Sequence, residues 1–120
     1  MSSEPTSVAA VSGEEEAQRA SDQDRQIEKL RARRTEVRRR ITITVSEIAK
    51  VLSRVGTRTS LDALVLQAQD LLLKSHKLTD QLCEFKDKVD TASEYQSQLE
   101  YQRSVQDAKE DVMNFAAELF

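Results

Sequence analysis

The segment LDALVLQAQDLLLKSHKLTDQLCEF, residues 61–85, decides the fold. Its apolar residues recur three and four positions apart, the spacing that gathers side chains on one face of an α-helix. In a heptad that starts at Leu61, the first and fourth positions are Leu61, Leu64, Ala68, Leu71, Ser75, Leu78, Leu82, Phe85 and Val89. No Gly or Pro follows Gly56, so nothing in this segment breaks a helix. We predict a helix over about residues 60–90.

A second helix is predicted upstream, over about residues 21–55. Its heptad starts at Ile27, and its seam positions are Ile27, Leu30, Arg34, Val37, Ile41, Thr44, Ile48, Val51 and Val55. Seven of these nine are aliphatic, the pattern of an amphipathic helix that packs on a partner. Arg34 is the charged exception. It either fixes the register of the helix pair or bends outward to keep its guanidinium in water, and both interpretations stay open.

The link between these two helices is short. Gly56 stands where a helix-ending glycine is expected, and Thr59 or Ser60 can cap the helix that follows. A short link makes the two helices antiparallel, with residue i roughly opposite residue 115 − i. Thr91 and Glu94 have the spacing of a capping box, so a third helix is predicted over about residues 92–118. A single unbroken helix after residue 60 is the alternative.

Composition and the N-terminal segment complete the fold prediction. Aromatic residues make up 4% of the 120 residues and charged residues 32%, which suits helices better than a sheet. Residues 1–20 have no apolar period and include three consecutive glutamates at 14–16, which is typical of a disordered tail. We therefore predict an all-α protein. A disordered acidic N-terminal tail at 1–20 precedes an antiparallel helical hairpin or a three-helix, coiled-coil-like bundle at 21–120.

Charge is unevenly distributed along the chain. Residues 1–24 carry a net charge of −5 and residues 25–40 a net charge of +6. This basic block can pair within the hairpin, where the counting rule brings it opposite four acids, Asp80, Glu84, Asp87 and Asp90. It can instead contact the phosphates of a nucleic acid through Arg31, Arg33, Arg38, Arg39 and Arg40. No aromatic residues for base stacking are interleaved with these arginines.

The apolar stripe of residues 61–85 is wider than one partner helix needs. Beyond the seam it includes Val65, Leu66, Leu72 and Leu73. A helix with so broad a stripe touches two neighbours, or one neighbour and another molecule. We expect these four residues to form a protein interface, used for homo-oligomer formation or for binding another helical protein.

Catalytic, cofactor and metal sites are not expected. Two Gly in the chain exclude a phosphate-binding glycine loop, and one cysteine excludes a multi-cysteine zinc site. His76, Asp80 and Cys83 can line one helical face as part of a metal site, but a fourth ligand is missing. An exposed histidine and a buried small thiol are the simpler expectation. We expect no enzymatic activity, no cofactor and no small-molecule ligand.

Location follows from two further features. No apolar run reaches the length of a membrane span, and residues 1–20 lack the basic and apolar regions of a signal peptide. We expect no membrane insertion and a cytoplasmic location, with the nucleus as the alternative.

The order of these parts resembles the helical N-terminal domain of Gag-like polyproteins of BEL/Pao retrotransposons. The resemblance is carried by the basic helix of residues 29–40 running into Ile41 and Thr42, by residues 61–85, and by Glu94, Tyr95 and Tyr101. It spans roughly residues 25–118. This chain departs from the pattern at Ile43, where the family often has a basic residue, and by having no Trp. The resemblance implies a self-assembling structural role in a Gag-like particle, or a domesticated fragment of one.

The function expected from the sequence is therefore non-enzymatic helical self-assembly or protein–protein interaction. Two alternatives stay open. One is a nucleic-acid-binding module that uses the basic first helix, and the other is an adaptor subunit that needs a foreign helix to complete a larger helical complex.

Overall fold

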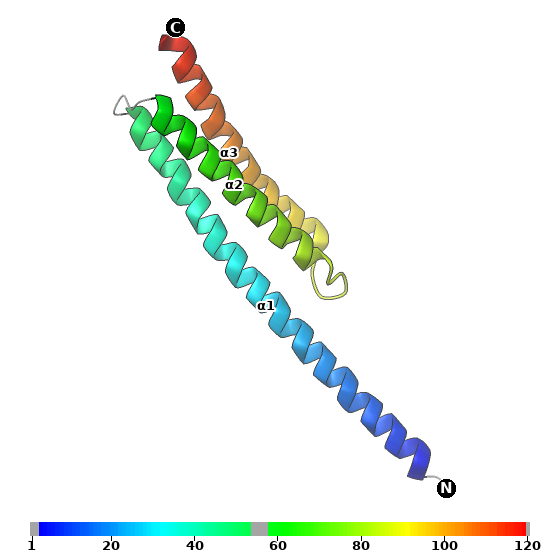
Figure 1. Cartoon of the computed structure of the whole chain (residues 1–120). Coiled ribbons are helices and arrows are strands. Elements are labelled where there is room, and N and C mark those ends of the chain that lie inside the picture. Colours follow the sequence, from blue (N-terminus) through cyan, green and yellow to red (C-terminus); the bar gives the residue numbers. More distant parts are fainter. Residues whose placement is uncertain (1–2, 54–57, 120) are drawn as a thin grey trace.

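A computed structural model gives the backbone of residues 3–53 and 58–119, and the side chains of residues 15–53 and 60–117. The chain is all-α, as predicted. It forms α1 (Ser3–Ser53), α2 (Arg58–Cys83) and α3 (Thr91–Leu119). Figure 1 shows α2 and α3 packed side by side along the C-terminal half of α1. The molecule is a rod 87 Å long and 20 Å by 15 Å across. No helix within these residues is long and apolar enough to cross a membrane.

Helices α1 and α2 form the predicted antiparallel hairpin. Arg38 meets Ser75 and Arg34 meets Thr79, so residue i lies opposite residue 113 − i. This register is two residues away from the expected one. Helix α2 begins at Arg58, so the two expected capping residues, Thr59 and Ser60, lie in its first turn. Gly56, expected to end the first helix, lies outside the described residues.

Three apolar clusters make up the core. The cluster nearest the α1–α2 link has Ile48, Leu61, Ala108 and Val112 as its buried members. The middle cluster has Ile41, Ala68, Leu71 and Val105. The cluster nearest the α2–α3 turn has Ile27, Leu82 and Val89. The predicted seams supply all of these α1 and α2 residues, because a stripe of period 3.6 must be buried for the helix to be stable.

The turn between α2 and α3 comes earlier than predicted. Helix α2 ends at Cys83, and hydrogen bonds from Lys88 N and Val89 N to the carbonyl of Phe85 shape the turn that follows. Val89 and the half-buried Phe85 pack in the cluster around Ile27, so burying them turns the chain back towards α1.

Helix α3 is capped by Asp90, not by Thr91 as predicted. Ser93 N donates a hydrogen bond of 3.3 Å to Asp90 Oδ1, which satisfies one of the free N–H groups of the first turn. Glu94 does not reach back to close a capping box. Its carboxylate instead pairs with Arg34 of α1, which places a strong charge pair where the weaker capping contact was expected.

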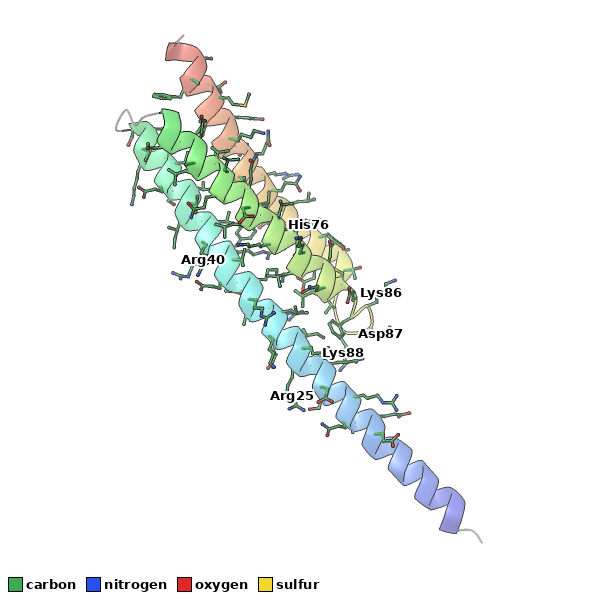
Figure 2. All side chains as sticks on the ribbon, in the orientation of Figure 1. Arg25, Arg40, His76, Lys86, Asp87 and Lys88 are labelled. Atoms are coloured by element: carbon green, nitrogen blue, oxygen red, sulfur yellow. The ribbon has the colours of Figure 1, made fainter. Side chains whose placement is uncertain are left out.

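The N-terminal part of α1 extends beyond the packed body. Lys88 Nζ donates a hydrogen bond of 2.9 Å to the carbonyl of Ala20 and pairs with Asp24 at 2.7 Å, which marks where contact begins (Figure 2). The side chains of residues 15–19 are exposed. The predicted acidic tail thus lies outside the bundle, and its backbone from Ser3 onwards continues the helix of α1. We name residues 15–24 the acidic extension.

Candidate protein-interaction surfaces

Two of the four predicted interface residues lie on the free surface of α2. Leu66 is 66% exposed and Leu73 is 61% exposed. They are seven residues apart, so they lie two turns apart on the same face of the helix. Isolated exposed leucines are common, but two on one line leave an apolar strip that the described part of the chain does not cover. We name this pair the leucine face.

The other two predicted interface residues belong to the bundle interior. Val65 is half-buried against the cluster around Leu61, and Leu72 is half-buried against the cluster around Ala68. The width of the stripe therefore has two causes. Part of it packs on α3 as well as α1, and only the leucine face remains for another molecule.

The basic block of α1 is divided between the interior and the surface. Among the described residues, none of the four predicted acidic partners forms an ion pair with an arginine of α1. The acidic residue that pairs with arginines of α1 is instead Glu94 of α3. Arg34 Nη1 lies 2.5 Å from Glu94 Oε2, and Arg31 Nη2 lies 3.4 Å from Glu94 Oε1. Arg34 therefore does not bend outward, since its side chain is only 10% exposed.

Arg38 is the most deeply engaged arginine. It donates hydrogen bonds to Ser97 Oγ at 2.9 Å and to Gln98 Oε1 at 3.0 Å, both on α3. Its Nε donates to Ser75 Oγ of α2 at 3.3 Å, so one guanidinium joins all three helices. The same group lies 4.7 Å from the ring centre of Tyr101. Burial lowers the pKa of Arg38, and the positive charge of Arg34 lowers it further.

Small polar side chains complete this layer of the interior. Ser75 Oγ donates to Gln98 Oε1 at 2.7 Å, and Thr79 Oγ1 lies 3.3 Å from the same oxygen. Among the described residues, no buried side-chain nitrogen or oxygen is left without a partner. We name Arg34, Arg38, Ser75, Thr79, Glu94 and Gln98 the polar layer. It separates the middle apolar cluster from the one near the α2–α3 turn. Because every group is paired, the layer fixes one register of the three helices.

Arg39 and Arg40 are surface residues that share one carboxylate. Arg39 forms two hydrogen bonds to Glu36, at 2.8 Å and 3.1 Å, and Arg40 Nε lies 3.5 Å from Glu36 Oε1. The hydrogen bonds from Arg39 hold the pKa of Glu36 below its ordinary value, and the carboxylate raises the pKa of Arg39 in return. All three side chains are well exposed, so these pairs contribute little to stability.

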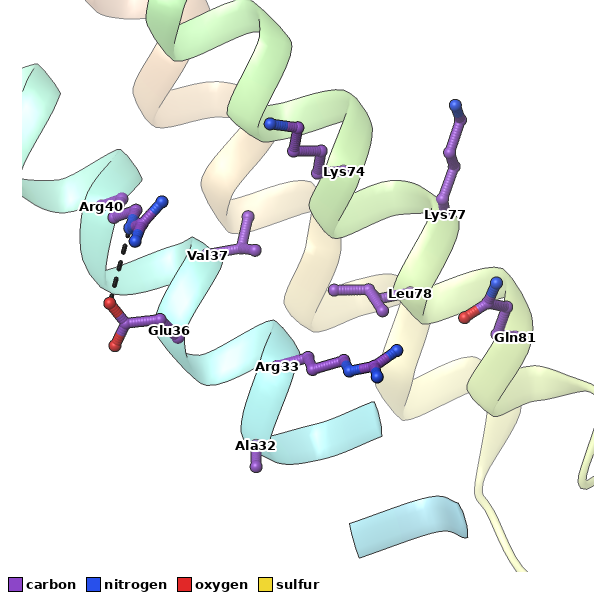
Figure 3. A pocket seen from close by; sticks show the side chains of 9 residues that line it. All are labelled: Ala32, Arg33, Glu36, Val37, Arg40, Lys74, Lys77, Leu78 and Gln81. Atoms are coloured by element: carbon purple, nitrogen blue, oxygen red, sulfur yellow. Dashed lines mark ion pairs between the residues drawn. The ribbon is translucent and has the colours of Figure 1, made fainter. Parts of the chain in front are cut away.

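A basic groove runs between α1 and α2, away from α3. Figure 3 shows Arg33 and Arg40 reaching into it from α1, with Lys74 and Lys77 on α2. Val37 and Leu78 form its apolar floor, and its volume is about 680 Å³. Glu36 is its one acidic side chain. We name this feature the basic groove. Of the five arginines predicted for nucleic-acid contact, it contains Arg33 and Arg40 only.

The residues proposed as a partial metal site do not form one. His76 Nε2 lies 3.5 Å from Asp80 Oδ2 on the surface, and Cys83 is buried. Burial raises the pKa of the Cys83 thiol. Tyr95 donates a 2.8 Å hydrogen bond to Asp80, which raises the pKa of the phenol to about 12. In the part of the chain whose side chains are described, no three His, Cys, Asp or Glu residues gather in a group fit for a metal ion.

The α3 members of the polar layer were missed from the sequence. Glu94 was assigned to a cap, and Gln98 was assigned no role. The available signal was spacing. Ser75 and Thr79 sit at helical spacing inside an otherwise apolar stripe, which indicates a buried polar position that needs partners.

Comparison with known proteins adds no relative. No family model, curated protein or solved structure matches this chain.

Proposed function

We propose that this chain is a non-enzymatic helical module that associates with copies of itself. The leucine face supports this most directly. Leu66 and Leu73 are each more than 60% exposed in the middle of a helix whose other large apolar side chains are buried or half-buried. Burying one leucine side chain contributes about 1.5–3 kcal/mol, so covering both on a partner is a substantial driving force.

The polar layer supports a structural role over a catalytic one. Its charged groups are saturated by each other, with Arg34 paired to Glu94 and Arg38 bound by Ser75, Ser97 and Gln98. A catalytic acid or base needs access to a substrate proton. Groups bound in this way act to fix helix register, which a docking surface requires.

The resemblance to Gag-like polyproteins agrees with this proposal. In that setting, the leucine face would join neighbouring copies in a particle or in a domesticated remnant of one. We place such an assembly in the cytoplasm, with the nucleus as the alternative.

The test is the solution mass, measured by light scattering in about 1 M salt, where charges are screened beyond about 3 Å. We expect the wild-type chain to form an oligomer there. We expect Leu66→Gln with Leu73→Gln to be monomeric, because these changes remove the apolar strip and leave the charge unaltered. Met113→Gln is the matched control, since Met113 is 60% exposed on α3. If the double variant keeps the wild-type mass, the leucine face is not the contact.

A second candidate is nucleic-acid binding, favoured by the four cations of the basic groove. Arg33 and Lys77 are the cations expected to contact phosphates, because Arg40 is already paired with Glu36. Binding of a single-stranded oligonucleotide should then weaken steeply with added salt, through release of counterions. Arg33→Glu with Lys77→Glu should abolish it. Binding that ignores salt or survives this double change rejects the candidate.

A third candidate is an adaptor that needs a foreign helix. It shares the leucine face but differs in the mass expected. If the chain stays monomeric at every concentration in high salt, self-association through the leucine face is rejected. The leucine face is then better explained as a docking site for a foreign helix.

A further inference from the structure

Two charged features of opposite sign lie largely exposed on the bundle. At the base of the acidic extension, Lys88 pairs with Asp24 and binds the carbonyl of Ala20. The acidic extension projects past the α2–α3 turn, and its side chains from Glu15 to Arg19 are exposed. The basic groove presents Arg33, Lys74 and Lys77 around an apolar floor. The ion pairs that these segments do make within α1, such as Glu15 with Arg19, are exposed and weak.

The extension of one chain cannot reach its own groove. Residues 15–24 and residues 33–40 belong to one continuous helix, α1, and a helix rises about 1.5 Å per residue. The two segments are therefore held at a fixed distance along one helix axis, and α1 cannot fold back on itself to bring them together. Only a second copy can bring an acidic extension to the basic groove.

We propose that two copies dock antiparallel through α1, each laying its acidic extension in the basic groove of the other. This proposal rests on the proposed self-association and names a second contact for it. The dimer has a two-fold axis near residue 28 of α1, so residue i of one copy meets residue 55 − i of its partner. A two-fold contact is closed, since each surface patch is used once on each copy.

The charges match residue by residue in this register. Glu15 meets Arg40 of the other copy, Arg19 meets Glu36, and Asp22 meets Arg33. Glu15 and Asp22 are seven residues apart, as are Arg33 and Arg40. The sign alternates in the same order on both segments, so each opposing pair is attractive.

The contacting residues also share one side of α1. Counting in sevens from Glu15 leads through Asp22 and Lys29 to Glu36, which lines the groove. Steps of seven residues stay close to one helical face. Both the extension and the groove therefore face the same way, as a two-fold contact requires. Lys74 and Lys77 of α2 add positive charge on the far side of the groove (Figure 3).

The dimer is expected to depend on salt. Its pairs are exposed, and screening beyond about 3 Å in 1 M salt removes most of their attraction, while about 0.01 M salt extends it to about 30 Å. The leucine face has the opposite behaviour, since apolar burial survives salt. The two contacts can therefore be tested separately.

The experiment uses full-length chains carrying Leu66→Gln and Leu73→Gln, which removes the leucine face, in about 0.01 M salt. This background should be a dimer. Reversing the extension with Glu15→Lys and Asp22→Lys should weaken dimerisation at least tenfold. Reversing the groove with Arg33→Glu and Arg40→Glu should do the same. Circular dichroism confirms that each variant keeps its helix content.

Mixing the two reversed variants is the decisive step. Each extension then meets a groove of opposite sign, so a one-to-one dimer should return. Arg103→Glu is the matched control, because Arg103 is exposed on α3 and lies neither on α1 nor in the groove. It should leave the dimer intact.

Three results would overturn the docking. The reversed variants could keep the mass of the background, or the mixture could stay monomeric. The groove reversal could also abolish oligonucleotide binding without changing the mass, which makes the groove a nucleic-acid site. None of these results bears on self-association through the leucine face. That contact is tested separately, by the mass of the wild-type chain in high salt.

Discussion

At the residue scale, Arg38 shows how a charge can be kept inside a small bundle. Its guanidinium has partners on α2 and α3 and a ring beside it, so no donor is left in an apolar wall. Removing it takes away the guanidinium donor to Ser97 Oγ and one of the donors to Gln98 Oε1. The energetic consequence should be much larger than for the neighbouring surface arginine.

We predict that Arg38→Ala destabilises the fold by about 3 kcal/mol, from lost charged hydrogen bonds and lost packing on Tyr101. Arg39→Ala should cost less than about 0.5 kcal/mol, because it changes only exposed contacts. Urea unfolding of the two variants beside the wild type measures both. Equal destabilisation would mean that the polar layer contributes no more than the surface.

The hydrogen bond of Tyr95 predicts how the stability of the fold depends on pH at high pH. Its hydroxyl donates to the carboxylate of Asp80, so losing the proton would place two negative charges side by side. The hydrogen bond to Asp80 therefore raises the pKa of the Tyr95 phenol from its ordinary 10.0 to about 12. A pKa raised by folding gives stability that is complete below the unfolded value and disappears as the pH rises through the folded one.

Ultraviolet titration should show the two tyrosines, Tyr95 and Tyr101, with Tyr95→Phe assigning the later step. Asp80→Asn removes the neighbouring charge and should bring the Tyr95 step down towards 10.0. An unchanged titration in Asp80→Asn would show that the carboxylate is not the cause.

At the scale of the elements, the helix boundaries depend on small polar contacts that the apolar pattern does not reveal. Asp90 caps α3 through Ser93 N, one residue before the predicted cap. We predict that Asp90→Ala destabilises the fold by about 1 kcal/mol, the usual effect of losing an N-cap. Thr91→Ala should destabilise the fold less than Asp90→Ala in the same urea unfolding series. A larger destabilisation by Thr91→Ala would mean that Thr91 caps α3, as the sequence predicted.

The sequence was sufficient for the elements themselves. The heptads in residues 27–55 and 61–85 predicted the hairpin, because burying an apolar stripe is the dominant requirement on a helix. The end of α2 was placed late because Phe85 and Val89 keep the heptad spacing while lying in a turn. Periodicity cannot distinguish a residue buried by a helix from one buried by a turn that folds against the same core.

The candidate site was predicted only in part for a related reason. Leu66 and Leu73 could be found from the width of the stripe, but Val65 and Leu72 could not be separated from them without knowing where α3 packs. Likewise, the basic block was expected to meet acids on the second helix, and the partner is Glu94 on the third. Pairing rules within a hairpin do not locate a third helix.

At the scale of the whole molecule, the protein is a rod with two kinds of free surface. The leucine face is apolar, and the acidic extension and basic groove are charged. Assembly through both would build chains of dimers, since a two-fold contact closes on one face and leaves the other available. The mass in low salt should therefore exceed the mass in high salt.

The measurement closest to the central claim is the mass of the wild-type chain by light scattering in about 1 M salt, over a wide range of concentration. The leucine face predicts a discrete oligomer there, which becomes a monomer when Leu66 and Leu73 are changed to Gln. A wild-type chain that remains monomeric throughout would contradict self-association.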